Sequence, residues 1–157
     1  MQKTKILKQS FISIMLTVVI GLSFIFNYLK TLKDKLIVIW LIFINLLNLL
    51  FVNNQNFIQN IAHDLVSFNF ALIFLLSNSK YLSYFTAFIV YLTLVYRIYL
   101  KECPFNYNIN KNKETTLFIE ELINFFLPQK IEFLNKIDII LIIAGFLFIL
   151  KGKLLKN

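Results

Sequence analysis

The sequence has few of the residues from which common catalytic and metal sites are built. Its 157 residues include one Cys, one His, three Gly and two Pro. A single Cys forms no internal disulfide, and one Cys with one His does not supply the ligand set of a zinc centre. Charged residues make up only 15% of the chain, against about 25% in average soluble domains. These shortages exclude a disulfide scaffold and a disordered chain, and we expect neither a metal nor a cofactor.

Apolar residues are abundant instead. They account for 59% of the chain, the aromatic share is 17%, and the mean hydropathy is +0.73. A soluble domain cannot bury such an excess, so a cytosolic enzyme is excluded and we expect lipid to be the solvent for most of the chain. The net charge of +8 comes from lysines that cluster beside apolar runs, which is typical of membrane edges and not of nucleic-acid binding. The clusters are Lys3, Lys5 and Lys8; Lys30, Lys33 and Lys35; and Lys151, Lys153 and Lys156.

Five apolar runs predict helices that cross a membrane. A helix rises about 1.5 Å per residue, so about 20 residues cross a hydrocarbon core of about 30 Å. The predicted spans are residues 11–29, 36–52, 57–76, 81–100 and 131–150. The fifth begins with Glu132, Lys136 and Asp138, so its apolar part is short and either crosses the bilayer or dips into it. The predicted fold is therefore all-α, a polytopic transmembrane bundle of four to five spans that forms a single domain over residues 1–157.

A further helix is predicted to lie on the membrane surface. Residues 114–127 alternate large apolar side chains with Glu120, Glu121 and Asn124, and Pro128 ends the segment. This pattern is too polar and too short to span, and it favours an interfacial helix. The positive-inside bias favours an amino terminus inside and leaves the carboxyl terminus open. The host bilayer is expected to be a bacterial inner membrane or an organellar membrane.

One cluster of ionisable residues is a candidate site. Counting from the turn at residues 77–80 puts Asp64 and Arg97 at depths that differ by about one helical turn, and Asp138 opens the fifth span on the same side. Together with His63 these residues could form a polar vestibule, in which His63 is a base or ligand, Asp64 orients it and Arg97 holds an anionic group. The alternative is structural, because charges at helix ends also pair only to satisfy one another.

Two other sets of residues have a functional and a structural interpretation. Asn45 and Asn48 lie three apart on one face of the second span, where Asn27 or Asn69 could bond to them across helices, as packing contacts or along a conduction path. A stripe of aromatic residues in the fourth span could line a quinone or lipid cleft, or could serve anchoring and packing. It consists of Tyr81, Tyr84, Phe88 and Tyr91.

Two stretches resemble motifs of signal peptidase II, a four-helix aspartyl protease that processes lipoproteins. Asn69-Phe-Ala-Leu-Ile-Phe74 is similar to its Asn-x-Gly-x-x-Phe signature, and Asn135-Lys-Ile-Asp138 to its Asn-x-Ala-Asp signature. The resemblance implies that Asp138 is one of a catalytic pair of aspartates. The second aspartate of that family lies in a Val-Asp-Phe context, where this chain has Ile123-Asn124-Phe125. The Gly-Asn-x-x-Asp-Arg element of the family has no counterpart here.

A second resemblance covers about half of the chain. The order of His63, Cys103-Pro104, Phe118-Ile119-Glu120 and a terminal span is similar to that of an uncharacterised bacterial family of small membrane proteins. In that family the Cys-Pro is followed by Leu-Thr, whereas this chain has Phe105-Asn106, a shorter loop and two additional spans. This resemblance implies a multi-pass membrane protein and no particular activity.

The pattern as a whole favours an accessory or structural subunit of a membrane assembly over an enzyme. Its expected partners are the lipid bilayer and other membrane proteins or further copies of itself, with no nucleic acid. The alternatives are a membrane-embedded enzyme and a small-solute channel or transporter, both of which need an open polar vestibule on the side that carries Arg97.

Overall fold

The fold was analysed in a computed structural model, which describes residues 2–52, 58–101 and 133–155; some side chains inside these ranges, including those of His63 and Asp64, are not described. Within these ranges the chain forms five helices and no strand, which confirms the all-α prediction. The helices are α1 (Gln2–Phe26), α2 (Leu32–Leu50), α3 (Ile58–Leu76), α4 (Lys80–Leu100) and α6 (Phe133–Leu154). The interfacial helix predicted at residues 114–127 lies outside the described residues.

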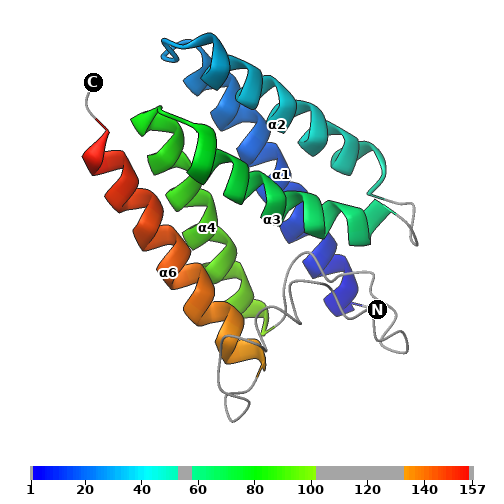
Figure 1. Cartoon of the computed structure of the whole chain (residues 1–157). Helices are drawn as coiled ribbons and strands as arrows, with labels where there is room; N and C mark the ends of the chain where they lie inside the picture. The colour runs from blue at the N-terminus through cyan, green and yellow to red at the C-terminus, as the bar shows by residue number, and fades with distance from the viewer. Residues whose placement is uncertain (1, 53–57, 102–132, 156–157) are drawn as a thin grey trace.

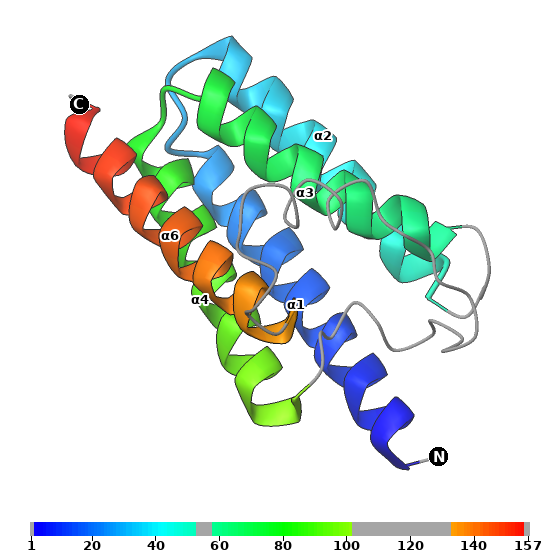
Figure 2. The same cartoon turned by 60° about the horizontal axis from the view of Figure 1, so that its bottom comes forward.

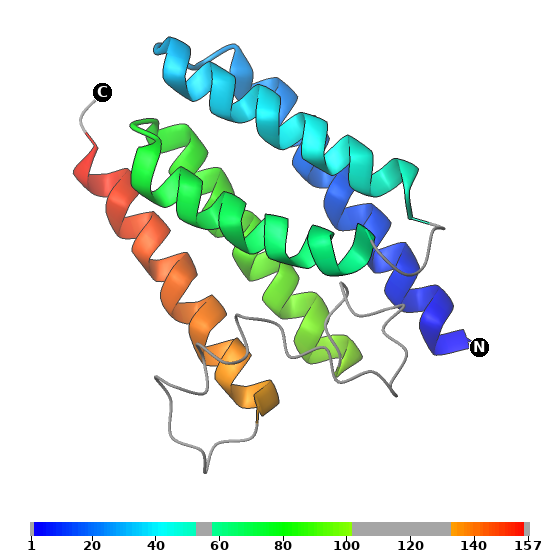
Figure 3. The same ribbon diagram turned by 45° about the vertical axis from the view of Figure 1, so that its right-hand side comes forward.

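Successive helices run up and down along one bundle (Figure 1). The α1–α2 connection, the α3–α4 connection and the carboxyl end of α6 gather at one end, called here the loop end, while the start of α1 lies at the opposite end. Helix α4 is central, because it packs along α6 and α1 and touches α3, and α2 packs against α1 and α3 (Figures 2 and 3). The two chain termini therefore lie at opposite ends of the bundle.

Polar side chains fix where two of the helices begin. Thr31 is the N-cap of α2 and its hydroxyl accepts from the Asp34 backbone N–H at 3.1 Å. Ser79 is the N-cap of α4 and accepts from the Leu82 N–H at 3.3 Å. A cap accepts from an N–H that the first turn leaves without a partner. Each cap stabilises its helix by about 1 kcal/mol. Lys101 ends α4 in the left-handed conformation with φ 54°.

The interior contains two groups of buried apolar side chains. The larger lies toward the loop end and joins α1, α2, α3, α4 and α6 through Leu22, Leu29, Ile37, Val38, Leu41, Ile73, Leu82, Ala87 and Phe148. The smaller joins α1 and α4 through Leu7, Phe11, Ile14, Met15 and Ile89. Phe148 of α6 also meets the rings of Phe70 and Phe74 of α3 edge-on at 6.3 and 5.5 Å between centroids, which ties α6 to α3.

All three glycines of the chain lie under aromatic rings of α4. A Cβ at Gly145 would stand 2.7 Å from the Tyr91 ring, one at Gly152 would stand 2.7 Å from the Tyr84 ring, and Gly21 lies under Phe85 in the same way. Gly145 and Gly152 are seven residues apart, as are Tyr84 and Tyr91. The same contact of a tyrosine ring over a glycine therefore occurs twice along the antiparallel α4–α6 interface. Small residues that let helices approach closely are typical of helix contacts in membranes.

We expect Gly145→Ala to destabilise the bundle by about 1 kcal/mol net. In an exposed helix this change stabilises by about 1 kcal/mol, but here the added methyl group collides with the Tyr91 ring, and overpacking costs about 1–3 kcal/mol. The measurement is unfolding in detergent followed by circular dichroism. In a Tyr91→Leu background the collision is removed, so the same change should become stabilising. A destabilising effect of equal size in both backgrounds would contradict the contact.

Apolar side chains also cover the outside of the bundle. Every helix has large apolar residues that are more than two fifths exposed. They include Ile20, Phe24, Leu36, Phe43, Phe68, Leu75, Phe88, Ile98, Ile142 and Phe146. Two of the described helices, over Lys5–Phe26 and Lys80–Leu100, are long and apolar enough to cross a membrane. Core helices of soluble proteins share these properties, so this result on its own indicates a membrane protein only weakly. Helix α2 is not among these two, because Lys33, Asp34 and Lys35 make its first turn too charged for a membrane-spanning helix.

Candidate functional site

Two of the four residues in the predicted polar cluster meet in the structure. Arg97, in the last turn of α4, donates from Nε to Oδ1 of Asp138, near the start of α6. The Arg97 side chain is 3% exposed and that of Asp138 is 29% exposed. The pair therefore joins the two antiparallel helices at the end of the bundle opposite the loop end. A buried guanidinium with a carboxylate partner is an electrostatically satisfied arrangement, and it does not by itself require a ligand.

The other two predicted residues are on α3. His63 and Asp64 lie in the second turn of that helix, and their side chains are outside the described residues. The first turns of α3 stand apart from the start of α6 in Figures 1 and 3. The predicted pairing of Asp64 with Arg97 and the convergence of all four residues stay predictions.

A buried aspartate that the sequence analysis did not single out joins two connections at the loop end. Asp34 is 2% exposed. Its Oδ1 accepts from the Ser77 hydroxyl at 2.7 Å and from the Asn78 backbone N–H at 3.1 Å, and its Oδ2 accepts from the Thr31 hydroxyl at 2.7 Å. The carboxylate therefore connects the start of α2 to the end of α3, 43 residues further along the chain.

The sequence contains a signal for the local half of this arrangement. Thr31 and Asp34 are spaced as in a capping box, in which the N-cap side chain and the residue three positions later bond to one another. No sequence signal identifies the other half, because Ser77 reaches Asp34 only through the tertiary packing of α2 beside α3.

A lysine of α6 completes the contacts at this end. Lys151 Nζ donates to the backbone oxygens of Ile73, at 2.9 Å, and of Phe74, and it lies 5.4 Å from the centre of the Phe74 ring. These carbonyls belong to the last turn of α3, where a positive charge is favourable. Burial lowers the pKa of the Lys151 ammonium, the Asp34 carboxylate opposes that shift, and Lys33 adds to it. Lys151 therefore holds α6 to the end of α3.

The asparagines inside the bundle act mainly as packing contacts. Asn45, Asn48 and Asn69 are buried, whereas Asn27 is exposed. Asn69 accepts from Trp40 Nε1 at 3.2 Å, and Asn45 donates to the Leu41 carbonyl of its own helix at 2.6 Å. The bond from α2 to Asn69 is therefore made by Trp40, where the sequence analysis expected Asn45 or Asn48.

The interior leaves little open space beside these asparagines. A cavity of about 50 Å³ is lined by Asn45, Asn69, Thr86, Thr93 and apolar neighbours, which is room for roughly one or two water molecules. Thr86 and Thr93 each bond to a carbonyl of their own helix. Among the described residues the Asn48 amide nitrogen is buried with no acceptor.

Comparisons of the chain with protein-family models, with curated proteins and with solved structures gave no match.

Proposed function

We propose that this chain is a five-span integral membrane protein that acts as an accessory or structural subunit of a membrane assembly. The observation that carries the proposal is the distribution of its side chains. Large apolar groups cover the outside of every helix, far more than the surface of a soluble monomer tolerates. Inside, the ion pair and nearly all of the buried polar groups of the described residues bond to one another or to their own helices. Such a molecule offers packing surface and few groups for chemistry.

The alternatives receive less support from the same observations. A solute channel or a membrane enzyme needs an open polar cavity at its centre. In the described part of the chain the interior cavity is small, and three of its polar side chains bond to carbonyls of their own helices. Arg97, which would hold an anionic substrate in a vestibule, is buried against Asp138.

The proposal predicts which positions of the chain face each side of the membrane. In a parent that carries Cys103→Ser, single cysteines at Lys33, Lys80 and Lys153 should react with a membrane-impermeant reagent from one side of the bilayer. Cysteines at Lys5 and Lys101 should react from the other side, because the loop end and the opposite end are separated by the length of the helices. Labelling of Lys33→Cys and Lys80→Cys from opposite sides would refute the arrangement, and equal labelling of all five from both sides would refute membrane crossing.

The subunit role is tested with the same parent. A photoreactive amino acid is placed in turn at the outward positions Ile20, Phe43, Phe88 and Phe146, and the matched control is the buried position Leu41. We expect a protein adduct of discrete mass from at least one outward face and none from Leu41. If all four outward positions yield only lipid adducts in the native membrane, the protein works alone and the subunit proposal fails.

A further inference from the structure

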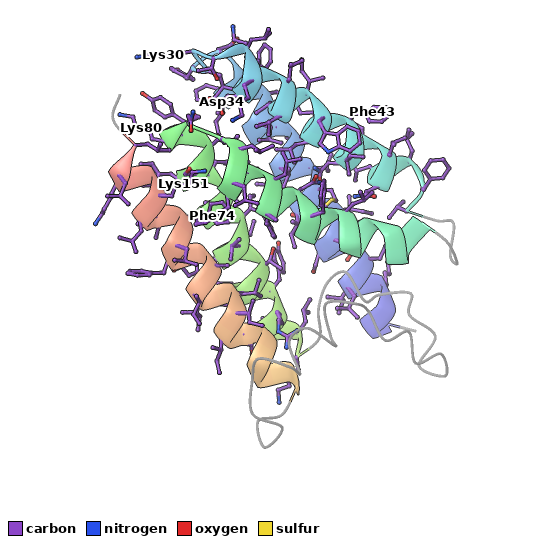
Figure 4. All side chains as sticks on the ribbon, in the orientation of Figure 1. Lys30, Asp34, Phe43, Phe74, Lys80 and Lys151 are labelled. Atoms are coloured by element: carbon purple, nitrogen blue, oxygen red, sulfur yellow. The ribbon has the colours of Figure 1, made fainter. Side chains whose placement is uncertain are left out.

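A cavity of about 390 Å³ opens at the loop end, between the two connections that meet there. The α1–α2 connection and the first turn of α2 form one wall, and the α3–α4 connection and the start of α4 form the other. The residues that matter here are Tyr28, Lys30 and Asp34 on the first wall and Ser79, Lys80 and Tyr81 on the second. Lys30, Asp34 and Lys80 lie near one another at this end in Figure 4. The volume is that of a small-molecule site.

The accessible charge of this cavity is positive. Lys30 and Lys80 come from opposite walls, and neither forms an ion pair with a described residue. The one acid in the lining, Asp34, is 2% exposed and directs both oxygens at Thr31, Ser77 and Asn78. Among the described residues the loop end carries six lysines against this one aspartate, namely Lys30, Lys33, Lys35, Lys80, Lys151 and Lys153. An anion therefore suits the cavity and a metal cation does not.

The backbone adds to this preference. Helices α2 and α4 both begin in the walls of the cavity, behind the N-caps Thr31 and Ser79. Each cap satisfies only one of the first-turn N–H groups, and the remaining ones carry the partial positive charge of a helix start. Phosphate groups bind well where such starts and lysines meet.

The rim of the cavity is apolar and aromatic, which points to a lipid as the source of the anion. The rings of Tyr28 and Tyr81 are 5.8 Å apart and each is about half exposed, and Lys80 Nζ lies 5.3 Å from the centre of the Tyr81 ring. Phe24, in the last turn of α1 and four residues before Tyr28, is 65% exposed and its ring is 5.4 Å from that of Tyr28. Tyrosines at headgroup level above an exposed apolar side chain match the two parts of a phospholipid.

We propose that this cavity binds the phosphate of an anionic phospholipid headgroup, with Lys30 and Lys80 as its two cationic contacts and Tyr28 and Tyr81 at headgroup level. The inference rests on the proposed membrane location. It goes beyond that location because it assigns a lipid class to a particular site. Exposed lysines elsewhere at the loop end attract anionic lipid diffusely, whereas the cavity brings two lysines and two helix starts to one group.

The test compares two double variants of equal charge in the full-length chain. Lys30→Gln/Lys80→Gln removes the two cavity lysines, and Lys33→Gln/Lys153→Gln removes two exposed lysines of the same end that do not line the cavity. Retention of phosphatidylglycerol is measured by native mass spectrometry after release from phosphatidylcholine nanodiscs that contain it. A lysine near an anionic surface is worth about a fivefold factor in affinity. We expect the cavity variant to lose at least about tenfold more affinity than the control variant.

Three outcomes of this experiment would contradict the proposed lipid site. Equal losses from the two double variants would mean diffuse attraction and would overturn the site. Equal retention of phosphatidylcholine and phosphatidylglycerol by the unmodified chain would overturn the preference for an anionic lipid. Displacement of the lipid by inorganic phosphate alone would assign the cavity to a free phosphate and overturn the lipid proposal. Sided cysteine labelling of the same variants in sealed vesicles shows whether the chain crosses the membrane, so failure of the membrane proposal is distinguishable from failure of the lipid site.

Discussion

Replacing Asp138 by Asn is expected to lower the free energy of unfolding by about 3 kcal/mol, because the change leaves the buried Arg97 guanidinium without this counter-charge. Replacing Arg97 by Gln should cost less, about 1–2 kcal/mol, since Asp138 is 29% exposed and can be hydrated when its partner is lost. Removing both charges should restore part of the loss. The measurement is unfolding of the purified chain in mild detergent titrated with a denaturing detergent, followed by helical circular dichroism.

The double variant isolates the interaction from the general effect of losing a charge. A coupling energy of about 1–3 kcal/mol is expected for a buried pair of opposite charges in contact. Lys101→Gln is the matched control, because Lys101 is an exposed cation close to Arg97 in the chain. Strictly additive losses in the Arg97 and Asp138 variants would show that the two residues do not stabilise one another. The same cycle with Asp64→Asn measures the predicted Asp64–Arg97 pair.

Helix positions were predictable from the sequence because they depend on local properties. The run of apolar residues at 81–100 and the helix Lys80–Leu100 differ by one residue at the start, where Ser79 caps the helix. The first helix begins at Gln2, well before the predicted start of the span at residue 11. The difference arises because residues 2–10, which are mostly polar, continue the helix, whereas a run of apolar residues marks only the part that suits lipid.

The Arg97–Asp138 contact was harder to predict because depth counting gives height along a bundle and not the side-by-side order of its helices. Asp64 and Asp138 were both expected on the side of Arg97, and the connection at residues 77–80 favoured Asp64. Helix α4 packs far more extensively on α6 than on α3, and the glycines beneath its tyrosines permit that contact. The spacing of Gly145 and Gly152, equal to that of Tyr84 and Tyr91, was present in the sequence as a signal for this pairing.

The side-by-side order of the helices also explains why the loop end could not be recognised from the sequence as a possible site. Lys30 and Lys80 are 50 positions apart, and each belongs to a separate short connection in the sequence. They face one cavity only because α2 lies beside α3, so that the α1–α2 and α3–α4 connections meet. Asp34 holds the two connections together through its hydrogen bonds with Ser77 and Asn78. The stability of the loop end and the proposed lipid site therefore depend on the same carboxylate.

Asp34→Ala is expected to destabilise the chain by about 3–4 kcal/mol. The change removes three hydrogen bonds to a charged acceptor, each worth about 1.5–3 kcal/mol before non-additivity. It also leaves the hydroxyl of Ser77, a fully buried residue, without its acceptor. Asp34→Asn keeps Oδ1 for Ser77 and Asn78 and can donate from its amide to the Thr31 hydroxyl. It should therefore cost only about 1 kcal/mol.

The matched control for both variants is Lys33→Ala, an exposed change in the same helical turn, for which we expect a shift within about 0.5 kcal/mol. Amide hydrogen exchange adds a local measurement, because the Asn78 N–H donates to Asp34 and should lose protection in Asp34→Ala while keeping most of it in Asp34→Asn. If the Asn variant is as unstable as the Ala variant although Asn78 stays protected, the negative charge among the six lysines stabilises the loop end, and the hydrogen bonds do not. Phosphatidylglycerol retention should follow the Asn78 protection, since the lipid site requires both connections to stay together.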